Sequence, residues 1–383
     1  MFFTIFIFLI VLSILVFVHE WGHFKAARIF GIKAEEFGLG LPPRIFGFYK
    51  DKNGKWKKVK GNEEILDAKD TVYSMNWIPI GGFVKIKGQD GESNVKVGEK
   101  EIDISKDNDN YINKPIWQRA IVISAGVFMN VVLAAIIFSF CFMIGMPQEK
   151  KDGPVQISHV NPGTPAESAD IQAGDLILYI NNTEIKNIEE IQTIVKNSNN
   201  QELKIQIQRD EETIEKNIKP ENNMLGIGLA YQKIIVKHSF FVSIYEGIKF
   251  TGIVLKKIVF GLAEMIANLF SDKSVGVQIA GPVGIASLTG QFAQIGLVYL
   301  LNFVALLSLN LAVLNFLPLP ALDGGHLLFL LIEKIKGSPV KKKLAMTIHN
   351  LGMYFFLFIF LIVTFIDISR LKIIKDLFGK IFN

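Results

Sequence analysis

The sequence predicts a polytopic α-helical membrane protein with about four transmembrane helices and an inserted soluble α+β domain. Half of the 383 residues are hydrophobic while a fifth are charged, so the chain has substantial water-exposed parts as well as apolar ones. Four apolar stretches reach the roughly 20 residues that a bilayer core requires. The long stretch between the second and third of them shows strand and turn patterns instead.

The predicted spans divide the chain in order. The first transmembrane helix is expected within residues 1–30, the second within 114–147 and the fourth within 350–368. The third lies within 293–331 and is broken by two prolines, which cannot continue a helix. The first stretch lacks a basic leader and a small-residue cleavage site, so we interpret it as a span that is retained and not as a signal peptide.

Charge near the span ends predicts the orientation. Basic residues follow the first span, precede the second and crowd the short connection between the third and fourth. Such connections are usually cytoplasmic. We therefore expect a multi-pass protein of the cytoplasmic (inner) membrane, with both termini and the second-to-third connection extracytoplasmic. The lysines otherwise scatter along the chain, which does not suggest a nucleic-acid partner.

The cytoplasmic-side connection, residues 31–113, contains two glycine-rich apolar patches at 37–43 and 77–86. Neither is long enough to cross a bilayer. The pattern leaves two alternatives open. The patches are ordinary surface hairpins, or they dip into the membrane where protein or a wet cavity satisfies their backbone groups.

Two further regions follow the second span. Residues 153–229 show short strands and one short helix in a pattern that resembles a PDZ domain, a module that binds extended peptides by strand addition. A passive spacer is the alternative. Residues 238–292 contain an amphipathic helix suited to the membrane surface, followed by a predicted turn at Gly281-Pro282-Val283-Gly284.

The chemistry is concentrated at the end of the first span, where His19, Glu20 and His23 lie within five residues. Residues four apart share one helix face, so the two imidazoles can hold one divalent metal. Ionisable groups inside a span cost about 2.5–3.5 kcal/mol each and are usually functional. The alternative is that these three residues merely end the helix at the water interface.

A catalytic zinc site has three protein ligands and one open position. Asp323 is our candidate for the third ligand, because it follows the third span directly on the same predicted side of the membrane. A helix cap is the alternative for this aspartate, and His326 is a competing ligand that we rank lower. With a metal in place the expected chemistry is hydrolysis, in which Glu20 takes a proton from water and passes it to the leaving amine.

The chain resembles the site-2 protease family, in particular its bacterial RseP-type zinc intramembrane proteases. The resemblance rests on the order of the predicted domains and on two distant motifs, His19-Glu20-x-Gly22-His23 and Asn315-x-x-Pro318-x-Pro320-x-Leu322-Asp323-Gly324-Gly325. It implies an active endopeptidase with one Zn²⁺ per chain. The single PDZ-like domain predicted here departs from the pattern of some relatives, which carry two.

The resemblance also implies a substrate and its binding residues. The substrate would be a single-pass transmembrane protein, such as an anti-sigma factor or a signal-peptide remnant, that a site-1 protease has already cleaved. A membrane-re-entrant β segment would hold the substrate extended, and residues beside the aspartate would bind its backbone. The candidate substrate-binding residues are Gly38, Gly40, Gly82, Phe83, Val84, Asn315, Pro318 and Pro320.

Two other classes of protein compete with the protease. A catalytically silent membrane adaptor would use only the PDZ-like domain to recruit partners, and the intact His19, Glu20, His23 and Asp323 argue against it. A metal transporter would need further ligands along a path, which the second and fourth spans do not offer.

Overall fold

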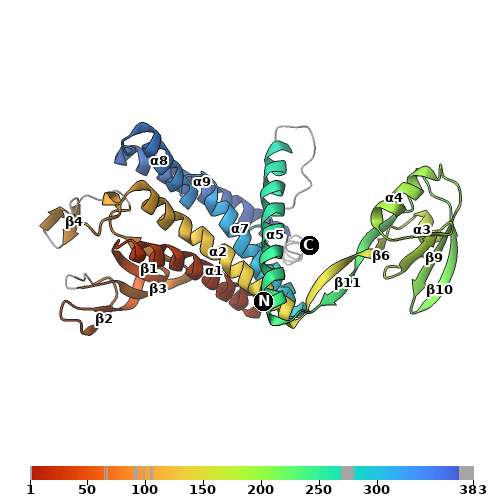
Figure 1. The fold of residues 1–383 in the computed structure, drawn as a ribbon, viewed down its shortest axis with the longest axis horizontal. Coiled ribbons are helices and arrows are strands. Elements are labelled where there is room, and N and C mark those ends of the chain that lie inside the picture. The colour runs from red at the N-terminus through yellow and green to blue at the C-terminus, as the bar shows by residue number, and fades with distance from the viewer. Residues whose placement is uncertain are drawn as a thin grey trace, which may run out of the picture. The chain divides into compact units, whose positions relative to one another are not determined.

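A computed structural model describes residues 2–63, 65, 68–89, 94–97, 100–103, 107–268 and 280–370. The chain divides into two compact units. One comprises Met1–Cys141 together with Ser239–Asn383, and the other comprises Phe142–His238. The first unit contains the long helices and a small sheet, and the second contains a separate sheet with short helices (Figure 1).

Four helices of the described part are long and apolar enough to cross a membrane. They are α1 (Phe2–Ile29), α2 (Ile116–Ile144), α7 (Leu297–Phe316) and α9 (Lys342–Arg370). A helix satisfies its own backbone hydrogen bonds, which a lipid-exposed segment requires. The protein is therefore a multi-pass membrane protein. α9 begins before residue 350, the start of the predicted span. Its first turns contain lysines, which the prediction of an apolar span left out.

The other helices of this unit are η1 (Tyr111–Asn113), the long amphipathic helix α5 (Phe240–Asn268), α6 (Pro282–Ile295) and α8 (Asp323–Lys336). The predicted turn at Gly281 to Gly284 is wrong, since Pro282 begins α6, a position that proline favours. The carboxylate of Asp367 in α9 accepts a hydrogen bond of 2.7 Å from the Gly284 N–H. Part of the predicted region 238–292, residues 269–279, lies outside the described residues.

The spanning helices α2 and α7 pack on α1. Val11 and Leu15 of α1 form a buried cluster with Val304 of α7. Nearer the end of α1, Ala27 packs with Val122 of α2. These contacts surround the part of α1 that carries the two histidines.

The sheet of the first unit has the order β2-β1-β3. Its strands are β1 (Ala34–Lys50), β2 (Trp56–Lys60) and β3 (Val72–Ile86), while β4 (Asn94–Val97) and β5 (Lys100–Asp103) form a separate hairpin. β1 and β3 bend, so that the first part of β1 lies between the two ends of β3. Phe37 of β1 is therefore paired with Val84 on one side and with Tyr73 on the other. The segment 82–86 therefore pairs with β1 along one edge, and its other edge lies beside α1.

The second unit is built on the sheet order β10-β9-β7-β6-β11, with β8 paired to β7. Its elements are β6 (Met146–Val160), α3 (Pro165–Ser168), β7 (Leu176–Ile180), β8 (Thr183–Glu184), α4 (Ile188–Asn197), β9 (Leu203–Arg209), β10 (Glu212–Ile218) and β11 (Ile227–Val236). Buried isoleucines from the strands and from α4 form its core. β6 and β11 extend beyond 153–229. α2 ends at Ile144, where Gly145 has a φ of +123° that breaks the helix, and Pro147 lies in β6.

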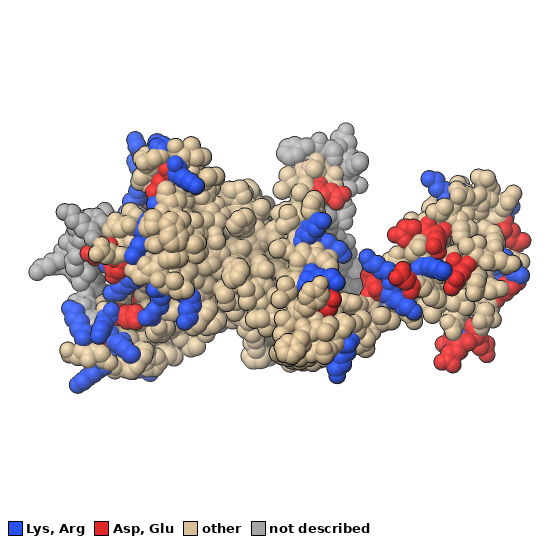
Figure 2. All heavy atoms as spheres, in the orientation of Figure 1, with Lys and Arg blue, Asp and Glu red and all other residues tan. Residues whose placement is uncertain are grey.

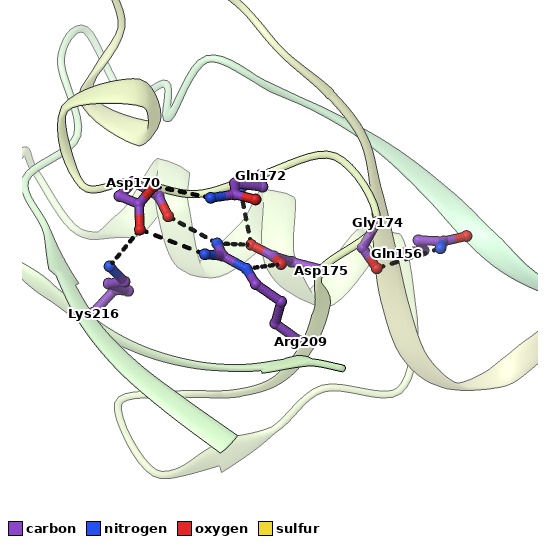
Figure 3. A network of polar contacts seen from close by, with 7 residues as sticks. All are labelled: Gln156, Asp170, Gln172, Gly174, Asp175, Arg209 and Lys216. Atoms are coloured by element: carbon purple, nitrogen blue, oxygen red, sulfur yellow. Dashed lines mark hydrogen bonds and ion pairs between the residues drawn. The ribbon is translucent and has the colours of Figure 1, made fainter. Parts of the chain in front are cut away.

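A polar network fastens one end of this second sheet (Figure 3). The Arg209 guanidinium donates to both oxygens of the buried Asp175 carboxylate, at 2.7 and 2.8 Å. It also contacts Asp170, as does Lys216 of β10. The Gln172 amide, together with the cations of Lys216 and Arg209, lowers the pKa of Asp170 to about 2.

Candidate metal centre

α1 places two imidazoles together on one face. The Nε2 atoms of His19 and His23 lie 3.2 Å apart, as expected for residues one helical turn apart. Both residues are buried, at 8% and 7% exposure. Their ring nitrogens therefore point into the protein and away from the lipid.

Asp323 reaches the same point from the start of α8. Its Oδ2 lies 3.0 Å from His19 Nε2 and 3.3 Å from His23 Nε2. Glycines permit this approach, because a Cβ on Gly324 would collide with the Leu317 carbonyl and one on Gly325 would meet the Leu319 carbonyl at 2.5 Å. The α8 N-terminus can thus fold tightly onto the turn that follows α7.

These three residues have the donor atoms that a metal ion requires. One ligand atom from each lies within 4.8 Å of the others. His23 Nδ1 lies 2.8 Å from the Val122 carbonyl, so its proton sits there and Nε2 presents a lone pair. Asp323 Oδ2 is buried and has no hydrogen-bond partner within the described part of the chain. Converging lone pairs of two imidazoles and a carboxylate fit a divalent cation.

Glu20 lies next to this cluster and is held from the other side. Its Oε2 accepts a hydrogen bond of 3.1 Å from the backbone N–H of Val84 in β3. Together with His19, Asn315 and Asp323, Glu20 lines a cavity of about 240 Å³. A carboxylate with access to this cavity can exchange a proton with a group held beside the metal ligands.

The glycines of the predicted substrate segment bring β1 and β3 close together. A Cβ on Gly38 would collide with the Phe83 ring, and a Cβ on Gly82 would meet the Gly38 carbonyl at 2.8 Å. Gly40 has a φ of +79°, which favours glycine. The structure therefore brings Gly82, Phe83 and Val84 beside α1, with Gly38 behind them in the sheet.

The turn between α7 and α8 holds the other predicted substrate residues. Asn315 lines the cavity. Pro320 packs against Gly352 of α9, where a Cβ would collide with it. Ala321 also lines the cavity, with a φ of +69°, a left-handed conformation that is strained for a residue with a Cβ. Pro318 lies in the same turn but is not among the residues that line the cavity.

Sequence reasoning missed two residues of α2. Asn130 is fully buried and lines the cavity, with its amide nitrogen 3.5 Å from His19 Nδ1. One turn before it, Gly126 lies so close to the candidate metal ligands that a Cβ would collide with His23 Nε2. A lone asparagine in an apolar span is a usable signal, since polar groups are rare there.

The remaining histidines lie elsewhere. The ring of His326 lies 5.3 Å from that of His349, and neither belongs to the three-residue cluster. His159 and His238 belong to the second unit. His326, the competing ligand, therefore does not lie with His19, His23 and Asp323 in the described part of the chain.

A His-His-Asp cluster with an adjacent glutamate, held among spanning helices, is the arrangement expected for a membrane-embedded metallopeptidase. The chain matches the description Peptidase family M50 over residues 7–59 and 63–359. The protein therefore belongs to peptidase family M50, the site-2 protease family, and is a metalloendopeptidase.

Curated relatives extend over almost the whole chain. Zinc metalloprotease RasP of Bacillus licheniformis is 31% identical, covering 96% of this chain and 99% of its own length. Regulator of sigma-W protease RasP of Bacillus subtilis is 28% identical, with the same coverage of both chains. Zinc metalloprotease RasP of Geobacillus kaustophilus is 28% identical over 95% of this chain and 97% of its own.

Proposed function

We propose that this protein is a zinc-dependent intramembrane endopeptidase that cleaves single-pass transmembrane substrates. The observation that carries the proposal is the convergence of His19, His23 and Asp323, whose ligand atoms lie within 4.8 Å of one another among spanning helices. These three residues would hold one Zn²⁺ per chain. The names of the RasP relatives, which are called zinc metalloproteases, support the choice of metal.

Glu20 is the proposed general base and acid. A zinc ion held by these three residues would be a Lewis acid that makes water a better nucleophile and polarises a carbonyl. Glu20 takes the proton of the attacking water and delivers it to the leaving amine nitrogen. The Val84 N–H positions the Glu20 carboxylate between the cavity and the edge of β3.

The outer edge of segment 82–86 is the proposed binding site for the substrate backbone. A helical substrate protects its peptide bonds by internal hydrogen bonding, so it must unwind before hydrolysis. An added strand along Gly82, Phe83 and Val84 would satisfy the unwound backbone, and Asn315 could bind a further backbone group across the cavity. We propose the bent sheet as the membrane-re-entrant β segment of the family.

The second unit is the proposed PDZ-like domain, with residues 153–229 as its core. It would limit access by bulky ectodomains or sense a peptide end, acting outside the cytoplasm while the metal centre lies near the cytoplasmic side. The relative named Regulator of sigma-W protease suggests substrates such as anti-sigma factors. Trimming by a site-1 protease would precede cleavage.

Glu20→Gln in the purified full-length protein tests the mechanism. With a model single-span substrate we expect cleavage to be lost, while metal analysis shows zinc retained, because glutamine keeps the shape but cannot carry the proton. Glu246→Gln in α5, where the half-buried carboxylate contacts Lys249, is the matched control and should cleave normally. Undiminished cleavage by the Glu20 variant would contradict the mechanism.

Asp323→Ala tests the ligand set separately. We expect zinc occupancy to fall, because the remaining pair of imidazoles leaves the site one ligand short. Unchanged zinc content would remove Asp323 from the ligand set. If the protein were a catalytically silent adaptor, the wild-type protein itself would bind the substrate without cleaving it. The wild-type cleavage assay therefore separates the adaptor from the protease.

A further inference from the structure

Aromatic and basic side chains share one exposed face of the β1–β2 hairpin. Residues directly opposite each other in a sheet lie on the same face. Phe48 lies opposite Lys58, and Lys50 lies opposite Trp56. Phe48 also lies opposite Tyr73 on its β3 side. We call this surface the hairpin face and define it by Phe48, Lys50, Trp56, Lys58, Lys60 and Tyr73.

The aromatic rings of the hairpin face are not needed for the hairpin's own core. Trp56 is 59% exposed and Phe48 43%. On the opposite face, Tyr49, Val59 and Val72 form a buried cluster. The sheet is therefore already packed on one side, and the apolar rings on the other side are left for a partner.

The charge of the hairpin is strongly positive. Residues 50–60 contain six lysines and one acid, Asp51, a net charge of 6 − 1 = +5. Asp51 is only 4% exposed and pairs with Lys57 at 3.5 Å. Figure 2 shows the lysines gathered over the β1–β2 hairpin. The hairpin therefore presents a concentrated positive surface without an exposed acid between 50 and 60.

The lysines lie directly over the rings. Lys50 Nζ is 5.3 Å from the centroid of the Trp56 ring, and Lys58 Nζ is 5.8 Å from that of Phe48. Cations and aromatic rings thus form one continuous surface. Such a combination matches the boundary between lipid headgroups and acyl chains, where amphipathic rings and lysines are enriched.

We propose that the hairpin face docks on the membrane surface and binds the headgroups of anionic lipids. The ring of Tyr73 in the hairpin face lies 6.1 Å from that of Phe24 in the spanning helix α1, which keeps the hairpin close to the bilayer. Clusters of four to eight basic residues beside a span are attracted to anionic leaflets. Nucleic acids would also attract the lysines, but the exposed rings beside a span favour lipid.

Docking has a consequence for the rest of the sheet. β1 is continuous from Lys50 in the hairpin to Gly38, which lies opposite Phe83 next to the metal centre. Anchoring the hairpin to lipid would therefore fix the far end of the sheet that carries segment 82–86. The lipid-binding proposal itself does not depend on the proposed catalytic role of that segment.

The test places a probe on the hairpin of the full-length protein. Asn53→Cys in a Cys141→Ser background provides a single labelling site for an environment-sensitive fluorophore, since Cys141 is the only cysteine. The labelled protein is placed in nanodiscs of phosphatidylcholine alone or with about 30% phosphatidylglycerol. Quenching by acrylamide, an uncharged water-soluble quencher, then reports exposure of the hairpin to water.

We expect weaker quenching in the anionic nanodiscs, and a return toward the neutral-lipid value at high salt. The triple variant K50Q/K58Q/K60Q should lose the protection, because each lysine near an anionic surface changes the docking equilibrium by about 5-fold. K186Q/K196Q/K204Q in the second unit is the matched control and should keep it. These exchanges leave the cluster of Tyr49, Val59 and Val72 intact.

Three results would overturn the proposal. Equal quenching in both kinds of nanodisc would show that anionic lipid does not bind the hairpin face. Equal loss of protection in the triple variant and in its control would remove the assignment to this face. Protection that is given only by an added polyanion such as RNA, and not by anionic lipid, would assign the face to a different class of partner.

Discussion

The backbone N–H of Val84 donates a 3.1 Å hydrogen bond to the Glu20 carboxylate. The same N–H lies on the edge of β3 that faces away from its β1 partner Phe37. A substrate strand added to this edge would need the same donor. On the proposed mechanism, substrate docking and release of the base would therefore be coupled through one hydrogen bond.

Val84→Pro removes this donor and should lower kcat/KM. Loss of one hydrogen bond to a charged group is worth about 1.5–3 kcal/mol, or roughly a 10- to 100-fold change in rate. Proline is tolerated on a sheet edge, so zinc content should stay normal. Val84→Ala keeps the N–H and is the control. Equal kcat/KM values for the two variants, measured on a single-span substrate, would contradict the coupling.

Asn130→Ala should weaken zinc binding through His19. The Asn130 amide nitrogen lies 3.5 Å from His19 Nδ1, and Asn130 Oδ1 is buried without a hydrogen-bond partner among the described residues. A half-turn of the amide lets Oδ1 accept the Nδ1 proton, which leaves Nε2 free to bind metal. Removing such a partner typically costs about 10- to 100-fold in metal affinity.

A chelator competition titration measures the zinc affinity of this variant. Asn130→Asp, which keeps an acceptor at the same place, should retain most of the affinity. An alanine variant with wild-type affinity would show that His19 is oriented without Asn130. Because this readout is metal affinity, it separates positioning of His19 from any effect on the substrate.

The sequence predicts those parts of this site whose residues are close together along the chain or directly follow a recognisable span. His19 and His23 are four apart on a helix, and Asp323 directly follows a span, so both features are readable locally. Asn130 has no such partner nearby in the sequence, and its role appears only when α2 packs on α1. The pairing of Gly38 with Phe83 is likewise non-local, which is why residue patterns alone left the two glycine-rich patches undecided.

Gly126→Ala should displace the metal ligands. A Cβ at this position would collide with His23 Nε2 and lie 2.8 Å from His19 Cε1, so the imidazoles or the α1–α2 packing must shift. We expect loss of zinc and of cleavage, measured by metal analysis and substrate assay. Gly252→Ala in α5 is the control, because no atom lies within 4 Å of its added Cβ. Full zinc occupancy in the Gly126 variant would contradict this close packing.

We expect Asp170 to make the second unit sensitive to acid. Hydrogen bonds from Gln172, Lys216 and Arg209 lower its folded-state pKa from 3.8 to about 2. A carboxyl group whose pKa is lower when folded stabilises the fold above its unfolded pKa. This contribution should therefore be complete above about pH 4 and disappear as the pH falls toward 2.

Hydrogen exchange of peptides from residues 153–229 in the full-length protein measures this effect. Comparing variants at each pH cancels the intrinsic pH dependence of exchange. Asp170→Asn should exchange faster than wild type at neutral pH, and the two should converge as the pH approaches 2. Glu184→Gln removes an exposed carboxylate paired with Lys186 and is the control for charge alone. A constant difference between Asp170→Asn and wild type at all pH values would show that titration of Asp170 does not set the acid sensitivity.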